Sequence, residues 1–167
     1  MKELVLGGAR SGKSAYAQRR AAESGLPVTM IATGTAGDEE MAARIARHRA
    51  ARPDGWRTVE APRQLALALR AEAAPGRCVV VDCLTLWLMN VIGSGFETER
   101  EALLGALPGL PGEVLFVANE IGLGIVPLGE ATRCFRDEAG RLNQDLAAAC
   151  ERVTFVAAGL PLTLKAP

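Results

Sequence analysis

A glycine-rich segment near the N-terminus has the residue spacing that binds nucleoside triphosphates. Gly7-Gly8-Ala9-Arg10-Ser11-Gly12-Lys13-Ser14 fits the pattern G-x-x-x-x-G-K-[ST] and follows the apolar run Leu4–Leu6. Glycines let backbone N–H groups approach phosphate oxygens, and the positive end of a following helix points at the same anion. Lys13 would then reach the β- and γ-phosphates, and Ser14 would ligate Mg²⁺. The segment predicts a user of nucleoside triphosphates; the alternative is a glycine-rich turn that happens to contain Lys-Ser.

A carboxylate further along the chain could share the metal ion with Ser14. The apolar run Cys78–Val81 ends in Asp82. Strands that end in a carboxylate often hold Mg²⁺ or its waters when a phosphate-binding loop lies upstream. The pattern is common, so the alternative remains that Asp82 caps the next helix. We favour the metal role and predict Ser14 and Asp82 as the metal ligands.

The single histidine, His48, lies in a strongly cationic segment. Residues 41–53 are typical of a helix that ends before Pro53, and helical spacing places Arg44, His48 and Arg52 on one face. An imidazole among guanidinium groups could attack a nucleotide phosphorus while the arginines stabilise the charge that develops on its oxygens. The residues alone favour the simpler alternative, a solvated basic helix face that carries an incidental histidine.

Two polar segments follow predicted strands and could also meet a nucleotide. Thr33-Gly34-Thr35 comes after the run Val28–Ala32, and Glu60 ends a short strand. Ligands of open α/β sheets bind at the carboxyl ends of the strands, so we expect both segments at that edge, although either could be an ordinary turn. The Asn-Lys-x-Asp signature of guanine-specific switch proteins is missing, which argues against a regulatory GTPase.

Short apolar runs alternate with helix-like segments along the whole chain. Within each run, apolar and polar residues do not alternate one by one, which is typical of strands buried on both faces of a parallel sheet. We therefore predict an α/β fold: one P-loop nucleotide-binding domain over residues 1–167, with a mostly parallel sheet flanked by helices. The predicted strands are Leu4–Leu6, Val28–Ala32, Cys78–Val81, Val114–Ala118 and Val153–Ala157, with weaker ones at Trp56–Glu60 and Leu162–Leu164. The predicted helices span residues 13–24, 38–52, 62–74, 84–92, 97–107 and 130–150.

Other local signals concern loops and burial. Gly105–Gly112 contains two prolines and predicts a surface loop. Leu84–Ile92 is apolar almost all round, so it is either buried in the core or part of a subunit contact, and burial is the simpler prediction. Four cysteines lack a C-x-x-C pair, which favours small core residues over a zinc site or a disulfide: Cys78, Cys83, Cys134 and Cys150.

Composition limits the classes of function. The chain has 167 residues, 49% of them hydrophobic, which suits one buried core. Its formal net charge is zero, so no nucleic acid or anionic membrane surface is expected as a partner. No apolar stretch reaches the roughly 18 residues of a membrane span, and the N-terminus does not read as a leader, so we expect a cytoplasmic protein without a membrane span.

Five segments together resemble one family of enzymes over nearly the whole chain, from Leu4 to about Lys165. They are Gly7–Ser14, Met41–Pro53, Val81–Leu88, Asn119–Pro127 and Phe135–Gln144. The set resembles the bifunctional adenosylcobinamide kinase/adenosylcobinamide-phosphate guanylyltransferases of cobalamin biosynthesis. The last two segments are much more specific than a phosphate-binding loop.

The resemblance implies two reactions. ATP or GTP would phosphorylate the aminopropanol hydroxyl of adenosylcobinamide, and GMP would then pass from GTP to that phosphate, which gives adenosyl-GDP-cobinamide and pyrophosphate. The family carries GMP covalently on a histidine, which corresponds to His48. The familiar pattern has two adjacent histidines, and Arg47 stands at the first position here.

By position, the resemblance also implies the contacts of the guanine nucleotide and the assembly. The contacts are the Gly7–Ser14 loop, Thr33, Gly34, Thr35, Arg49, Ala50, Ala51, Arg52, Glu60 and Asp82. Family members form homotrimers, which predicts a homotrimer. Two alternatives remain, a single-activity P-loop kinase of small molecules with an incidental His48 and a GTP-binding regulatory module. The Asn119–Pro127 and Phe135–Gln144 segments argue against both.

Overall fold

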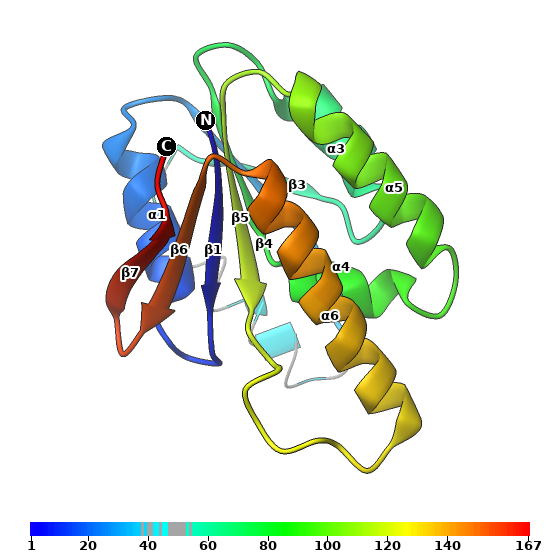
Figure 1. Cartoon of the computed structure of the whole chain (residues 1–167). Coiled ribbons are helices and arrows are strands. Elements are labelled where there is room, and N and C mark those ends of the chain that lie inside the picture. Colours follow the sequence, from blue (N-terminus) through cyan, green and yellow to red (C-terminus); the bar gives the residue numbers. More distant parts are fainter. Residues whose placement is uncertain (38, 40–41, 44, 47–52, 54) are drawn as a thin grey trace.

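The computed structural model describes residues 1–37, 39, 42–43, 45–46, 53 and 55–167. Over this part of the chain the strands form one sheet in the order β3-β2-β4-β5-β1-β6-β7 (Figure 1). The strands from β1 to β6 pair in parallel, and β7 is antiparallel to β6, which confirms the predicted mostly parallel sheet. Their bounds are β1 Lys2–Gly7, β2 Val28–Ala32, β3 Arg57–Glu60, β4 Cys78–Asp82, β5 Glu113–Asn119, β6 Arg152–Ala157 and β7 Leu160–Lys165.

Helices cover both faces of the sheet (Figure 1). They are α1 Lys13–Glu23, α3 Leu65–Glu72, α4 Leu84–Val91, α5 Phe96–Ala106 and α6 Glu130–Ala149. The five confirm the helices predicted in those regions, whereas the helix predicted over 38–52 falls largely outside the described residues. None of the described helices combines the length and the apolarity needed to cross a lipid bilayer.

The core has two layers, one on each face of the sheet. On β1, Leu4 and Leu6 pack with side chains of α3 to α6, whereas Val5 packs with those of α1. Since successive strand residues point to opposite faces, a strand buried on both faces needs an unbroken apolar run. Burial of α4 is confirmed as well, because Trp87 is fully buried and only Met89 of its large apolar side chains is well exposed.

The surface loop predicted over Gly105–Gly112 is wrong. Helix α5 continues to Ala106, a 3₁₀ turn spans Leu107–Gly109, and both Leu107 and Leu110 are buried. Proline is tolerated in the first turn of a helix because its missing N–H has no partner there, so Pro108 does not force the chain outward.

Three of the four free cysteines are core residues, as predicted, but Cys134 is exposed on α6. Burial raises the pKa of Cys78 to about 11, of Cys83 to about 11 and of Cys150 to about 12. Among the described residues no group of three or more His, Cys, Asp or Glu side chains could hold a metal ion.

We expect a thiol reagent to label one cysteine in the folded protein. At pH 8 a thiol with a pKa near 11 is only about 0.1% thiolate. The buried cysteines are therefore unreactive, and the reagent cannot reach them. Intact mass after brief alkylation should show one adduct, which Cys134→Ser removes. Labelling in urea should modify all four, and fast labelling of a second cysteine in the native state would contradict this burial.

Candidate active site

The phosphate-binding loop lies at the carboxyl edge of the sheet, at the end of an interior strand. Strand β1 ends at Gly7, α1 begins at Lys13, and residues 8–12 connect them. Strands β5 and β6 flank β1, with Gly7 in register with Asn119 on one side and Val156 on the other. The ends of three buried strands therefore fix the place where the loop begins.

Close packing explains the glycines of this loop. A Cβ at Gly7 would lie 2.4 Å from Val156 O and 2.5 Å from Ser11 Oγ, and Gly12 has a φ of +96°, which side chains rarely adopt. Neighbouring backbone also holds the loop: the Glu120 N–H donates to Gly7 O at 2.9 Å, and the Gly159 N–H donates to Ser11 O at 2.8 Å.

Polar groups of the loop point to an anion site. Lys13 is only 8% exposed and its Nζ donates to Gly8 O at 2.9 Å, so the loop curls around the ammonium group. Ser11 Oγ is buried, and within the part of the chain that the structure describes it has no hydrogen-bond partner. A buried orphan hydroxyl beside a lysine and a helix N-terminus suits phosphate oxygens, which accept hydrogen bonds from all three.

Asp82 and Ser14 have the donor chemistry of a magnesium site. Ser14 lies in the first turn of α1, and Asp82 ends β4. The cap residue of α4 is Cys83 and not Asp82, so the capping alternative does not hold. Strand β5 separates β4 from β1, which puts Asp82 about 10 Å to the side of the loop at roughly 4.8 Å per strand. Mg²⁺ usually keeps several of its waters, and a carboxylate at that distance can hold the ion through one of them.

Thr33 has a structural role that its position alone did not reveal. Its fully buried hydroxyl donates to Cys83 O at 2.6 Å and accepts from the Cys83 N–H at 3.0 Å, so it joins the ends of β2 and β4. Asn90 organises the same loop, because its amide donates to Thr33 O at 2.8 Å and to Pro62 O at 3.0 Å, while the Thr35 hydroxyl contacts its Oδ1 at 3.2 Å. Sequence reasoning missed Asn90, although an amide in the mostly apolar α4 was the available signal.

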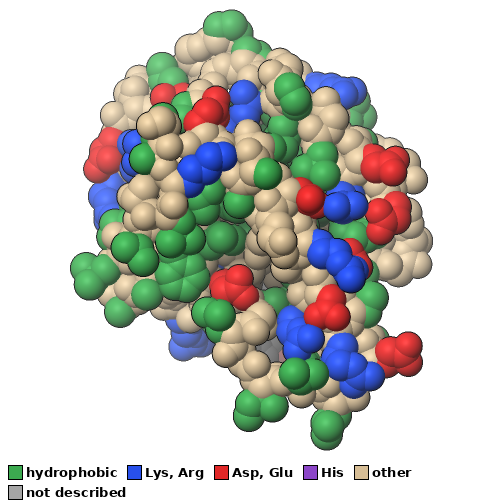
Figure 2. Space-filling view, in the orientation of Figure 1, with side chains coloured by type: hydrophobic (Ala, Val, Ile, Leu, Met, Phe, Trp, Pro, Cys, Tyr) green, Lys and Arg blue, Asp and Glu red, His purple; other side chains and the backbone are tan. Residues whose placement is uncertain are grey.

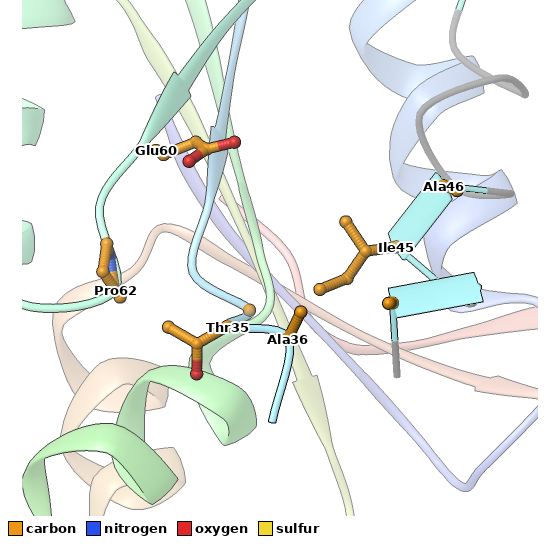
Figure 3. A pocket seen from close by; sticks show the side chains of 8 residues that line it. Thr35, Ala36, Ile45, Ala46, Glu60 and Pro62 are labelled. Carbon is orange, nitrogen blue, oxygen red and sulfur yellow. The ribbon is translucent and has the colours of Figure 1, made fainter. Parts of the chain in front are cut away.

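A cavity of about 800 Å³ opens beside these residues (Figure 3). In Figure 3 Glu60 and Pro62 lie on one side of it and Ile45 and Ala46 on the other. Its described lining is Gly34, Thr35, Ala36, Ala42, Ile45, Ala46, Glu60 and Pro62. Among these residues Glu60 is the only charged one, and the rest offer small or apolar walls.

The structure thus places most of the predicted site residues at one edge, and the others lie outside the described residues. The loop at Gly7–Ser14, Thr33–Thr35, Glu60 and Asp82 all follow or end parallel strands of the same sheet. His48 and the stretch Arg49-Ala50-Ala51-Arg52 lie outside the described residues, together with Arg44 and Arg47.

The sequence analysis used Asn119–Pro127 for the family resemblance but gave no site role to the end of β5, which lies next to the loop. The Asn119 N–H donates to Thr85 Oγ1 at 2.8 Å, and the Asn143 amide approaches Asn119 O at 3.5 Å. The segment that follows, residues 120–129, exposes large apolar side chains, among them Leu123 at 83%, Ile125 at 97% and Leu128 at 98%. Two polar residues directly after an apolar run, Asn119 and Glu120, were the signal for this part of the edge.

A family model and two relatives of known name agree on one family for this chain. A family model described as cobinamide kinase / cobinamide phosphate guanyltransferase matches residues 3–164. The bifunctional adenosylcobalamin biosynthesis protein CobP of Pseudomonas aeruginosa is 59% identical over 99% of this chain and 98% of its own length. The bifunctional adenosylcobalamin biosynthesis protein CobU of Escherichia coli is 38% identical over 99% of this chain and 100% of its own.

Solved structures share the fold at low identity. The RadB recombinase superposes with a TM-score of 0.54 at 18% identity, over 92% of this chain and 73% of that one. A protein of Pyrococcus horikoshii OT3 gives a TM-score of 0.57 at 10% identity, over 99% of this chain and 86% of that one. These two likenesses support the α/β architecture only.

We expect Gly7→Ala to abolish nucleotide binding and to lower the free energy of unfolding by about 1–3 kcal/mol, because the added methyl group would overlap Val156 O. Calorimetric titration with ATP and GTP and thermal unfolding measure the two effects. Gly8→Ala is the matched control for folding, since no atom lies within 4 Å of its added Cβ. A Gly7→Ala variant that binds and unfolds like the wild type would contradict the packing described.

Proposed function

The chain belongs to the cobinamide kinase / cobinamide phosphate guanyltransferase family, and from this premise we propose how its residues divide the two reactions. Membership confirms the resemblance seen in the sequence. The protein is a bifunctional enzyme of cobalamin biosynthesis that phosphorylates adenosylcobinamide and then transfers a guanylyl group to the phosphate. Its nucleotide substrates bind through a P-loop fold.

The observation that carries the proposed site is that the phosphate-binding loop and the Glu60 cavity open at the same edge. Four strand spacings, about 19 Å, separate the ends of β1 and β3. The loop and the cavity would therefore hold different parts of a bound nucleotide. We assign the terminal phosphates to Lys13 and the loop, and the guanine base of GTP to the cavity.

Glu60 has the chemistry to select guanine. A carboxylate is an acceptor with two oxygens, and guanine presents two adjacent N–H donors, N1 and its exocyclic amine, on one edge. Adenine has no such pair of donors. The small and apolar walls of the cavity suit the faces of a purine. The same cavity would thus favour GTP over ATP for guanylyl transfer, while a loop that contacts only phosphates accepts either.

Covalent catalysis at His48 divides the transfer into two displacements. The imidazole nitrogen forms a bond to the α-phosphorus of GTP while the bond to the β-phosphate breaks and pyrophosphate leaves. An oxygen of adenosylcobinamide phosphate then attacks the same phosphorus and releases the histidine. Support for His48 comes from its cationic sequence and from the family, since it lies outside the described residues. Arg49 and Arg52 would stabilise the phosphoryl charge.

Ser14 and Asp82 would hold Mg²⁺, which supplies charge neutralisation on the phosphates when it is bound. The donor set fits this hard cation, because both groups offer oxygen. Lys13 would act at the same phosphates, with its ammonium already directed into the loop by Gly8 O.

Exposed apolar surface supports a subunit contact, which the proposed homotrimer would provide. Strand β7 is an edge strand, and Leu160, Leu162 and Leu164 on it are 57–72% exposed. Figure 2 shows apolar side chains gathered over the region of β6 and β7. Open strand edges and apolar patches of this kind are commonly covered by a subunit contact.

The free thiols suit a reducing compartment, and we propose a cytoplasmic enzyme.

We expect Glu60→Gln to lower kcat/KM for GTP in guanylyl transfer by about 5- to 150-fold, which corresponds to the roughly 1–3 kcal/mol of one bidentate contact to a base. The ATP-driven kinase reaction should change by less than about twofold, because its nucleotide is held by phosphate contacts. Initial rates with both nucleotides measure this split. Glu101→Gln on the exposed face of α5 is the control, and an equal loss with ATP would contradict a role in base selection.

Incubation with GTP and Mg²⁺ should add one GMP to the wild-type enzyme, as an acid-labile adduct visible by intact-protein mass spectrometry. His48→Ala should form no adduct and should lose guanylyl transfer while it still phosphorylates adenosylcobinamide. If the wild type formed no adduct but kept the kinase reaction, the single-activity kinase would be the better description of the chain.

A further inference from the structure

The two reactions differ in what they demand of a base. The kinase acceptor is an alcohol, which keeps its proton at neutral pH, whereas the acceptor of the guanylyl group is a phosphate monoester that is already anionic. A proton acceptor is therefore needed in the first reaction and not in the second. Three carboxylates end or directly follow parallel strands at the site edge, and they are Glu60, Asp82 and Glu120.

The order of the strands separates these carboxylates by their distance from the phosphate-binding loop. Glu120 follows β5, the immediate neighbour of β1, whereas Asp82 ends β4 and Glu60 ends β3. At roughly 4.8 Å per strand, they lie about 5, 10 and 19 Å to the side of β1. On the other side of β1, the turn after β6 consists of Ala158 and Gly159 and offers no carboxylate. Of these three carboxylates, Glu120 therefore lies nearest to the phosphate-binding loop.

Contacts fix Glu120 in that position. Its N–H donates to Gly7 O at 2.9 Å, so its backbone is tied to the first residue of the loop. Its Oε1 accepts the Gly122 N–H at 2.6 Å, which orients the carboxylate. In the part of the chain that the structure describes, the second oxygen of this carboxylate has no hydrogen-bond partner. The residue as a whole is half-buried.

The segment after Glu120 exposes apolar side chains against which a large acceptor could pack. Residues 121–129 follow Glu120 directly, and Leu123, Ile125 and Leu128 in this segment are exposed. Arg133 braces the segment by donating to Pro127 O at 3.1 Å. Figure 2 shows apolar side chains projecting at the lower end of the molecule, where this loop lies in Figure 1.

We propose that Glu120 is the general base of the kinase step, an assignment that rests on the proposed function. The hydroxyl proton passes to Glu120 Oε2 while the hydroxyl oxygen forms a bond to the γ-phosphorus. The bond from that phosphorus to the β–γ bridging oxygen breaks, and the nucleoside diphosphate leaves with its electron pair. Glu120 then returns the proton to solvent. The roles proposed above for the other two carboxylates are unchanged: Asp82 would bind Mg²⁺, and Glu60 would bind the guanine base.

The test compares the two reactions in Glu120→Gln. Glutamine keeps an oxygen that can accept the Gly122 N–H, so the loop retains its geometry while the base is lost. One assay supplies ATP and adenosylcobinamide, and the other supplies GTP and purified adenosylcobinamide phosphate. We expect kcat of the kinase reaction to fall by about 100-fold or more, with KM for ATP and the rate of guanylyl transfer within about twofold of wild type. Glu130→Gln, a carboxylate at the other end of the same loop, should leave both rates unchanged.

The outcomes separate this assignment from the proposed function. Retained kinase activity in Glu120→Gln would overturn it, and so would an equal loss of both reactions, which would indicate a structural role. A wild-type enzyme that catalysed neither reaction would overturn the proposed function, and the role of Glu120 with it. Selective loss of the kinase reaction would establish Glu120 as its base.

Discussion

The packing around Gly7 is the constraint on which the active-site edge depends. A Cβ at this residue would lie 2.4 Å from Val156 O, so no side chain fits, and the ends of β1, β5 and β6 meet there. A buried polar cluster fixes the same elements underneath: Glu3 Oε1 accepts from the Tyr16 hydroxyl at 3.1 Å and from Thr154 Oγ1 at 2.8 Å. Strand β1, helix α1 and strand β6 are thereby joined, and Lys13 takes its position from them.

Much of this arrangement could be predicted from the sequence because the chemistry is local. A phosphate-binding loop needs glycines at fixed spacing, and strands buried on both faces need unbroken apolar runs, so Lys13, Asp82 and Glu60 could all be expected at the carboxyl edge. The order of the strands is not local information. Only the structure shows that β5 lies between β4 and β1, which brings Glu120 to the loop and moves Asp82 aside. The role of Thr33 was hidden in the same way, since its partner Cys83 is fifty residues away.

A sheet edge with this order suits an enzyme with two reactions. The phosphate-binding loop after β1 serves any triphosphate, because it contacts the part that ATP and GTP share. Selectivity for the base can lie at β3, and proton transfer can lie at β5, without either disturbing the other. Separate strands thus carry separate requirements, and the common requirement for phosphate binding is met at β1, the strand next to β5.

The hairpin of β6 and β7 determines when the phosphate-binding loop can acquire its final contacts during folding. The Gly159 N–H that holds Ser11 O belongs to the turn of that hairpin, nearly the whole chain away from the loop. Contacts so distant in sequence form late, because a long segment must first be ordered. During synthesis the glycine-rich motif leaves the ribosome well before Gly159, which is translated 148 residues after Ser11. The segment that looks most self-contained in the sequence is therefore among the last parts of the fold to be completed.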